Sequence, residues 1–289
     1  MVYTEKTVFL SSEAGQIELA RLLSLSGLEQ GESQWGVTSG YLQDGALLGN
    51  GRYTERSVAL SFDLESKEAV QTAGQILGKR KITLEILERY PGEDRTERYY
   101  LYPCRTTAPL SVVRRGREWY SCSVQLSAAD PYIQKETEDQ TLAQEDARKI
   151  YRNDYLWYPE DALVLSANRM EVAVYNEGDA DAPMEIRFLG PADQPYILNM
   201  DTGEKLGVNQ VLEAGEYMDI STAYGQKRIT ITRLDGVTHN AFHYIQAGCV
   251  FFQLHPGANR LRYGSAGTSG AALAGVRIRY DSRFSSYML

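Results

Sequence analysis

The sequence predicts a mainly β protein, because short stretches in which apolar and polar residues alternate recur along it. In the C-terminal half, from Val172 to Met288, turn signals separate these stretches so closely that no layer of helices fits between them. This layout predicts an antiparallel β-sandwich or barrel. The turn signals include Asn176-Glu-Gly178, Asp201-Thr-Gly203, Glu213-Ala-Gly215, Asp235-Gly236 and Leu254-His-Pro-Gly-Ala-Asn259.

The N-terminal part shows the same strand pattern, interrupted by one helix. Residues 56–64 are the clearest strand, because their apolar residues occupy every second position. Ser66 is a suitable N-cap, apolar residues follow it at helical spacing, and Gly78 is a natural stop, so a helix is expected over 66–77 with one face on the sheet. Further strands are expected at residues 7–10, 16–19, 82–87, 98–102, 110–113 and 119–126.

Two segments lack such a pattern. Residues 26–52 are rich in Gly, Ser and Gln and contain Asp44-Gly45 and Asn50-Gly51, which favours an extended loop or a mobile hairpin. Residues 134–150 are polar and acidic without apolar periodicity, and we expect them to connect two domains, with a short surface helix as the alternative. The expected organisation is an N-terminal domain over 1–133, a connection over 134–150 and a second domain over 151–289.

Aromatic residues gather at the borders of these domains. Residues 151–158 carry four aromatics, which open the second domain or pack across its boundary. At the other end, Phe284, Tyr287 and Met288 indicate that the last residues pack, with the N-terminal domain as one option. The predicted fold class is therefore mainly β, with an N-terminal β-sandwich or split barrel containing one helix and a C-terminal antiparallel β-sandwich.

Composition narrows the function classes. The 289 residues carry a net charge of −8, which argues against a basic surface for nucleic acid. The one basic candidate is Arg114-Arg115-Gly116-Arg117, for which a hairpin turn is the favoured interpretation. The three cysteines, Cys104, Cys122 and Cys249, lack CxxC spacing and fit buried thiols in a reducing compartment.

The N-terminus lacks the basic run and apolar core of a signal peptide. No apolar run approaches the ~20 residues that a membrane span needs. We therefore expect no membrane insertion, and synthesis and assembly in the cytoplasm.

The sequence offers no pattern for catalysis, a cofactor or a metal. His239 and His243 have the spacing of a metal pair on a helix, but their surroundings indicate a turn entering a strand, and no HExxH motif occurs. His255 is expected in a turn. GxSxG, P-loop and GxGxxG motifs are absent, while a pair of catalytic carboxylates stays open because sequence spacing does not fix a distance in space. We predict no catalytic, cofactor-binding or metal-binding residues. The residues alone leave two hypotheses: a structural assembly protein, or a carbohydrate-binding or carbohydrate-cleaving sandwich.

The order of several phrases resembles the distal tail protein family of long-tailed bacteriophages. The first part is similar through Gly15-Gln-Ile-Glu-Leu19, Arg56 at the head of its strand, and the ending Trp119 to Asp130-Pro131-Tyr132. The second part is similar through Asn176-x-Gly178, Pro183 to Gly190, Ala214-Gly215-Glu216 and Leu254-x-Pro-Gly-x-Asn259. No single one of these sequence phrases is specific to the family. Their order over nearly the whole chain is specific to it. The ring-forming part of prophage-derived contractile particles would look similar.

The resemblance implies a galectin-like C-terminal sandwich and an N-terminal domain that forms a six-fold ring at the end of the tail tube. The partners it implies are other copies of the chain in a homo-hexamer, the tail tube protein, the tail-tip hub or tail-associated protein, and a receptor-binding protein. DNA would pass through the ring without specific binding, and the protein would lie at the tail tip of the virion. Such a ring needs two different faces on each subunit, and residues 26–52 and the helix at 66–77 are our candidates.

A sugar-binding role of the C-terminal sandwich is the alternative to this adapter role, and an enzyme ranks third. Galectins hold sugar with a tryptophan and polar side chains on one face. No Trp occurs between residues 158 and 289, so the adapter role is preferred.

Overall fold

The computed structural model describes residues 5–29, 33–39, 46–90, 95–116, 119–136, 140–143, 163–165, 171–265 and 275–287, with the backbone alone at 33–39, 46–52, 140–143 and 163–165. The chain divides into two compact units. The N-terminal unit contains residues 1–136 and 284–289, and the C-terminal unit contains residues 137–283.

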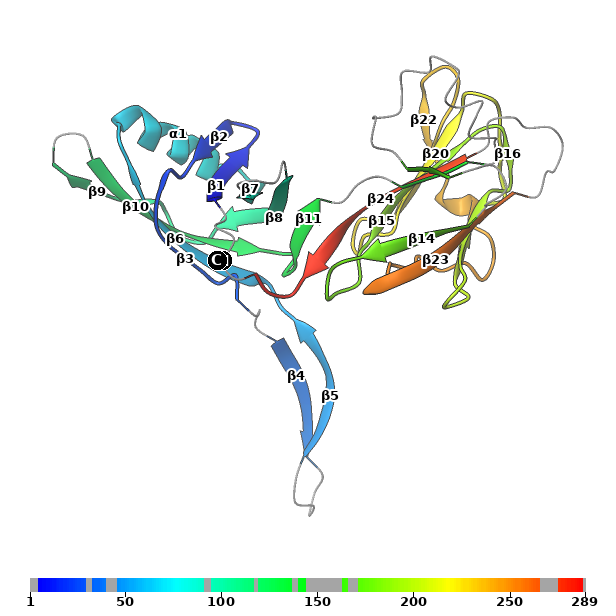
Figure 1. Ribbon diagram of the computed structural model, residues 1–289, viewed down its shortest axis with the longest axis horizontal. Coiled ribbons are helices and arrows are strands. Elements are labelled where there is room, and N and C mark those ends of the chain that lie inside the picture. Colours follow the sequence, from blue (N-terminus) through cyan, green and yellow to red (C-terminus); the bar gives the residue numbers. More distant parts are fainter. Residues whose placement is uncertain are drawn as a thin grey trace. The chain divides into compact units, whose positions relative to one another are not determined.

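Two antiparallel sheets and one helix form the N-terminal unit around a single core (Figure 1). One sheet has the strand order β2-β1-β7-β8-β11 and the other has the order β3-β6-β10-β9. The end of β10 also pairs with β8, from Leu126 opposite Thr106 to Ala128 opposite Cys104, so the sheets join at one corner. The elements are β1 (Glu5–Ser12), β2 (Gly15–Glu18), β3 (Arg21–Ser26), β6 (Arg56–Leu64), α1 (Lys67–Leu77), β7 (Ile82–Tyr90), β8 (Arg95–Thr106), β9 (Ser111–Arg115), β10 (Trp119–Ala128) and β11 (Ile133–Glu136).

Local sequence explains the best-predicted elements of this unit. Alternation along β6 directs Leu60 and Phe62 into the core, where both are buried. The Ser66 hydroxyl accepts a hydrogen bond from the backbone N–H of Ala69 at 3.0 Å, which satisfies one of the free donors at the start of α1. The helix then lies against β1, β2 and β6 through its buried residues, Ala73, Ile76 and Leu77.

Residues 26–52 form a hairpin where the structure describes them. Its strands are β4 (Ser33–Ser39) and β5 (Ala46–Tyr53), which pair antiparallel with a bulge between Trp35 and Val37. No other described strand pairs with this hairpin, which we call the β4–β5 arm (Figure 1). Of the two expected forms of this segment, the hairpin is the one found.

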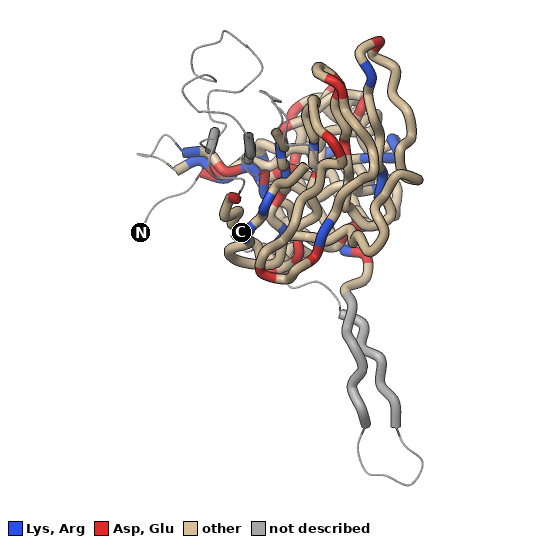
Figure 2. The backbone as a smooth tube through the Cα atoms, turned by 90° about the vertical axis from the view of Figure 1, so that its right-hand side faces the viewer, with Lys and Arg blue, Asp and Glu red and all other residues tan. Residues whose placement is uncertain are grey.

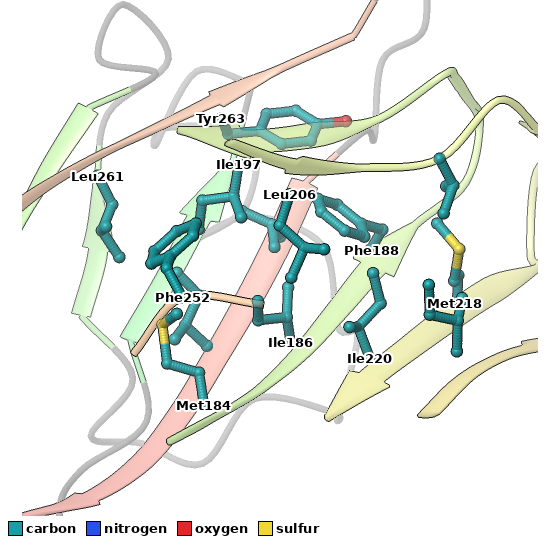
Figure 3. Close-up of a cluster of buried hydrophobic side chains, with 14 of the residues drawn as sticks. Met184, Ile186, Phe188, Ile197, Leu206, Met218, Ile220, Phe252, Leu261 and Tyr263 are labelled. Carbon is teal, nitrogen blue, oxygen red and sulfur yellow. The ribbon is translucent and has the colours of Figure 1, made fainter. Parts of the chain in front are cut away.

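The C-terminal unit is a sandwich of two antiparallel sheets. One sheet has the order β24-β15-β20-β21-β22 and the other β14-β23-β17-β18. Their inner faces meet in a core in which Phe188 and Ile186 of β15 and Met218 and Ile220 of β20 lie near Tyr263 of β23 (Figure 3). The elements are β14 (Glu171–Asn176), β15 (Met184–Leu189), β16 (Ala192–Asp193), β17 (Tyr196–Asn199), β18 (Lys205–Gly207), β19 (Val211–Leu212), β20 (Tyr217–Ser221), β21 (Arg228–Thr232), β22 (Thr238–Asn240), η1 (Phe242–Tyr244), β23 (Gly257–Gly264) and β24 (Gly275–Phe284).

The expected connection at 134–150 contains strand residues. Its start belongs to β11, and β12 (Gln140–Ala143) pairs with β24 and, in parallel, with β13 (Leu163–Leu165). Backbone pairing is open to any side chain, so a polar stretch without periodicity can still join a ladder. The aromatic stretch at 151–158 lies outside the described residues.

Charged residues of the C-terminal unit are interleaved by sign and paired across strands (Figure 2). Arg187 of β15 holds Asp219 of β20 through two hydrogen bonds of 2.6 and 3.0 Å. Arg228 of β21 reaches Glu185 of β15 at 3.0 Å. These pairs lie on the solvent face of the sheet, where cross-strand pairing of opposite charges is favourable.

Candidate assembly surface of the N-terminal unit

The outer face of the β3-β6-β10-β9 sheet is dominated by serine. Alternation puts the apolar residues of β6 in the core, so Ser57 and Ser61 fall on the opposite face. The strand registers extend this face, because Ser61 lies opposite Ser24 on β3 and opposite Ser123 on β10. We call this surface the serine face; its serines are Ser24, Ser26, Ser57, Ser61, Ser111, Ser121 and Ser123.

The serine face carries little that could bind a partner tightly. Its middle holds Ala59 and Gln125 in addition to the serines, and no charged residue. Charge enters at the two ends. At one end Asp63 accepts a hydrogen bond from Ser121 at 2.6 Å, and Arg21 lies over the Trp119 ring at 4.2 Å from its centroid. At the other end Ser127, which lies opposite Ser57, donates to Glu55 at 2.6 Å and lies opposite Arg105. Serine is depleted in protein interfaces, whose energy comes from aromatic residues and arginine. Small neutral hydroxyls instead make a wettable surface without strong attachment points.

Both edge strands of this same sheet lack a second partner among the described strands. Among the described strands, β3 pairs only with β6, and β9 pairs only with β10. The β3 edge shows Leu23, which is 60% exposed beside a bulge, and the β9 edge shows Val112 and Val113, which are 40% and 56% exposed. Unpaired edges with exposed apolar side chains are templates for pairing with another chain. The two edges differ in sequence and in regularity, so they are two different surfaces.

A buried arginine fixes the base of the β4–β5 arm. Arg56 is 3% exposed and is the first residue of β6, separated from the end of β5 by Thr54 and Glu55. Its guanidinium donates to the backbone carbonyls of Gly27 at 3.0 Å and Glu29 at 2.7 Å, which precede the arm. It also donates to Pro131 at 2.5 Å and to Ser285 at 2.6 Å. We call this set of contacts the Arg56 clamp. It joins three distant segments, because a guanidinium offers five N–H donors in a fixed plane.

The last described residues complete the N-terminal unit. The Tyr287 backbone N–H donates to the Leu28 carbonyl at 2.7 Å, and its hydroxyl donates to the Glu88 carboxylate. Its ring lies 4.9 Å from that of Tyr99, which also contacts Phe284 at 6.1 Å. The chain after β24 therefore packs against β7, β8 and the segment before the arm.

A network of tyrosines and carboxylates supports this tail. Burial alone would raise the pKa of Glu97, but hydrogen bonds from Tyr99 at 2.7 Å and Lys135 at 3.1 Å outweigh it and lower the pKa to about 2. Burial and the hydrogen bond to Glu88 raise the pKa of Tyr287. The carboxylates thus stay ionised and the tyrosines stay neutral donors, which is the arrangement that their hydrogen bonds need.

Two surfaces were expected from the sequence to meet a neighbouring subunit, residues 26–52 and the helix at 66–77. Side chains of most of residues 26–52 lie outside the described residues, so the arm is known here by its backbone. The outward side of α1 is polar, with Lys67, Glu68 and Gln71 exposed. The free edges, the serine face and the Arg56 clamp were missed. The signal for the serine face was present in residues 57–64, where Ser57, Ala59, Ser61 and Asp63 alternate with apolar residues.

The histidines lie apart from any helix that could align them. His239 is exposed on β22, and His243 in η1 lies beside the Tyr244 ring at 3.9 Å. His255 contacts Asp181 at 2.8 Å. In the ranges that the structure describes, no cluster of three or more His, Cys, Asp or Glu side chains is placed to hold a metal, and no helix is long and apolar enough to span a membrane.

Two other expectations can be compared with the described residues. Arg114 and Arg115 lie in the β9–β10 hairpin next to Gly116, whose φ of 82° suits a turn, while Arg117 lies outside the described residues. All three cysteines are free thiols; Cys104 and Cys122 are buried, whereas Cys249 is only partly buried. Burial raises the pKa of Cys104 to about 12.

Comparisons with known proteins agree with this architecture. Residues 177–284 match the family model of the siphovirus-type tail component, C-terminal domain. The crystal structure of the Dit protein of phage SPP1 superposes with a TM-score of 0.61 at 12% identity, covering 97% of this chain and 99% of that chain. It is described as a paradigm of the hub adsorption apparatus in phages that infect Gram-positive bacteria.

Two structures of the phage p2 baseplate in its activated conformation are also similar. The structure with strontium gives a TM-score of 0.56 and the one with calcium 0.53, each at 10% identity over 98% of this chain and 100% of that chain. At such identities the likeness shows a shared fold. No curated protein matches the sequence. Residues 177–284 therefore carry a domain of the siphovirus-type tail component family, and the chain as a whole has the fold of the SPP1 Dit protein.

Proposed function

We propose that this chain forms a six-fold ring that joins the tail tube to the tail-tip hub and carries receptor-binding proteins. The number six and these neighbours come from the family resemblance. The chain acts structurally in this role, without catalysis, and is assembled in the host cytoplasm into the tail tip of the virion. The observation that carries the proposal is the pair of unlike free edges, β3 and β9, on one sheet of the N-terminal unit.

A closed ring requires that one surface of each subunit meet a different surface of the next. The β3 edge of one copy and the β9 edge of its neighbour meet this requirement, because joining them continues the sheet from subunit to subunit. Exposed Leu23 on one edge and Val112 and Val113 on the other would be covered by that junction. The arm and α1 lie in the same unit and are further candidates for contact with the next subunit.

The serine face would then become the wall of the channel. A ring of continued sheets has one face toward its axis, and the other face of this sheet is occupied by the core. The middle of this wall, with its small neutral hydroxyls, gives a passing polyanion no basic attachment point. DNA would therefore move through the ring without specific binding.

The mass of the purified protein in solution tests the ring directly. Light scattering should give six times the 32.4 kDa of one chain, or about 194 kDa, and electron microscopy should show rings with a central hole. A mass of 32.4 kDa at every concentration, or a two-fold dimer, would contradict the proposal.

Edge variants test how the ring closes. Leu23→Lys should block the β3 edge, and the double variant Val112→Lys/Val113→Lys should block the β9 edge, because lysines on edge strands oppose pairing. Each variant alone should be monomeric, whereas their mixture should give a dimer through the one intact junction. The control is Leu234→Lys, which changes an apolar side chain that is 71% exposed in the C-terminal unit and should leave the ring intact. A two-fold interface would instead let one of the edge variants dimerise alone.

A further inference from the structure

A cleft of about 680 Å³ opens at one end of the N-terminal unit. It lies between the end of β1, the turn after α1, the start of β7 and Tyr102 of β8. Neither the ring edges nor the serine face includes it. Its most prominent residues are the consecutive cations Lys79, Arg80 and Lys81, which all line the cleft.

The cleft has an excess of positive charge. Lys79 is paired with Glu13 at 3.0 Å, and Glu13 is the only carboxylate among the lining residues. Arg80 and Lys81 are exposed and have no ion pair in the described part of the chain. Two cations therefore remain available in a cleft of a protein whose net charge is −8. A cleft with more positive than negative side chains attracts anionic ligands.

Hydroxyl donors lie beside these cations. Ser11 of β1 and Thr83 of β7 are direct neighbours across the strand pair, and both line the cleft. Tyr102 adds a phenolic hydroxyl from β8. Guanidinium, ammonium and hydroxyl groups together are the donors that carboxylate and phosphate oxygens accept from.

The position of α1 helps to hold the cations and sets a limit on the ligand. The helix ends at Leu77, and its C-terminal carbonyls carry partial negative charge that stabilises positive side chains nearby. The same charge, together with Glu13, opposes a ligand with many closely spaced negative charges. A nucleic acid also needs a basic track along its backbone, whereas the cations here are confined to one turn. One or two carboxylates on a flexible chain fit the cleft better.

We infer that this cleft binds the carboxylate side chains of an acidic polypeptide segment. That this segment belongs to a neighbouring protein of the tail rests on the proposed ring, whereas binding of carboxylates by the cleft does not. The site would add a charge-based contact to an assembly whose subunits otherwise join through strand edges.

Fluorescence anisotropy with labelled hexaglutamate tests the inference on the full chain. Hexaglutamate should bind, the uncharged hexaglutamine should not, and the affinity should fall as salt shortens the screening length toward ~3 Å at about 1 M. Arg80→Gln/Lys81→Gln should weaken binding about tenfold, as expected for the loss of two exposed ion pairs. Glu13→Gln should tighten binding, because it releases Lys79 for the ligand, and an unfolded variant could not produce this gain.

The matched control removes two charges elsewhere. Lys67→Gln/Arg89→Gln lowers the net charge equally at exposed positions outside the cleft and should leave the affinity unchanged. Equal loss in both double variants, or no binding of hexaglutamate, would overturn the inference. Tighter binding of a short thymidine oligonucleotide or of inorganic phosphate than of hexaglutamate would assign the cleft to phosphate and overturn it as well. These readouts use the isolated protein, so they stand whether or not the mass measurement shows a ring.

Discussion

Removing the Arg56 clamp should destabilise the N-terminal unit far more than removing an exposed arginine. In Arg56→Met an unbranched but shorter side chain replaces the arginine, and four hydrogen bonds to backbone carbonyls are lost, at 2.5, 3.0, 2.7 and 2.6 Å. At about 1 kcal/mol for each hydrogen bond lost, the free energy of unfolding should fall by about 4 kcal/mol. Arg56→Lys keeps the charge but cannot reach all four carbonyls, so it should lose about half as much.

Urea unfolding followed by tryptophan fluorescence measures the effect, and the control is Arg105→Met. Arg105 is 73% exposed and reaches Glu55 only at 3.9 Å, so its loss should cost under ~0.5 kcal/mol. Deleting residues 285–289 removes one of the four acceptors, so the deletion and Arg56→Met should be less than additive. Hydrogen exchange should also rise around residues 27–29. If Arg56→Met unfolds within ~0.5 kcal/mol of the parent, the clamp does not stabilise the unit.

Three further predictions concern charge, backbone and core. The folded-state pKa of Glu97 is about 2, below the ordinary 4.5, so its contribution to the free energy of unfolding is present above about pH 4.5 and is lost as the pH falls toward 2. The urea midpoint should therefore drop across this pH range in the parent protein. In Glu97→Gln the midpoint should depend less on pH. Gly27→Ala should cost more than ~2 kcal/mol in the same assay, because Gly27 has a φ of 92° and an added Cβ would lie 2.1 Å from the Ser57 carbonyl oxygen. The control is Gly203→Ala, which should cost only about 1 kcal/mol, because Gly203 has a similar φ of 74° but open space around an added Cβ. Phe188→Ala should cost ~3–5 kcal/mol in the C-terminal unit, because Phe188 is fully buried there; a thermal melt that is unchanged would show that the two sheets do not share that core.

The elements that the sequence predicted well are those with a local cause. The strand at 56–64 and the helix at 66–77 follow from periodicity and from the Ser66 cap, and both are confirmed. The mainly β fold of both parts is confirmed as well. Two serines of the serine face, Ser57 and Ser61, alternate with the apolar residues of the strand at 56–64, so they could be seen in the sequence. Such alternation normally indicates only that one face of the strand is exposed to solvent.

Long-range partners could not be predicted from local pattern. A single strand, β10, pairs with β6, β8 and β9, and nothing in its sequence states which strand is beside it. Arg56 precedes an apolar run and carries no periodic signal, yet it binds carbonyls as far away in sequence as Ser285. The cleft beside Lys79 likewise depends on how β1 and β8 approach the end of α1.

The return of the chain to the N-terminal unit has a consequence for protein synthesis. Residues that complete this unit, including Ser285 and Tyr287, are translated only after the whole of 137–283. Their contacts to Arg56, Leu28 and Glu88 are missing until then. Strand β24, which pairs with β15 and contributes to the core of the C-terminal sandwich, ends directly before them, so the same last stretch of residues completes both units. A nascent chain that has not yet passed β24 can therefore complete neither unit.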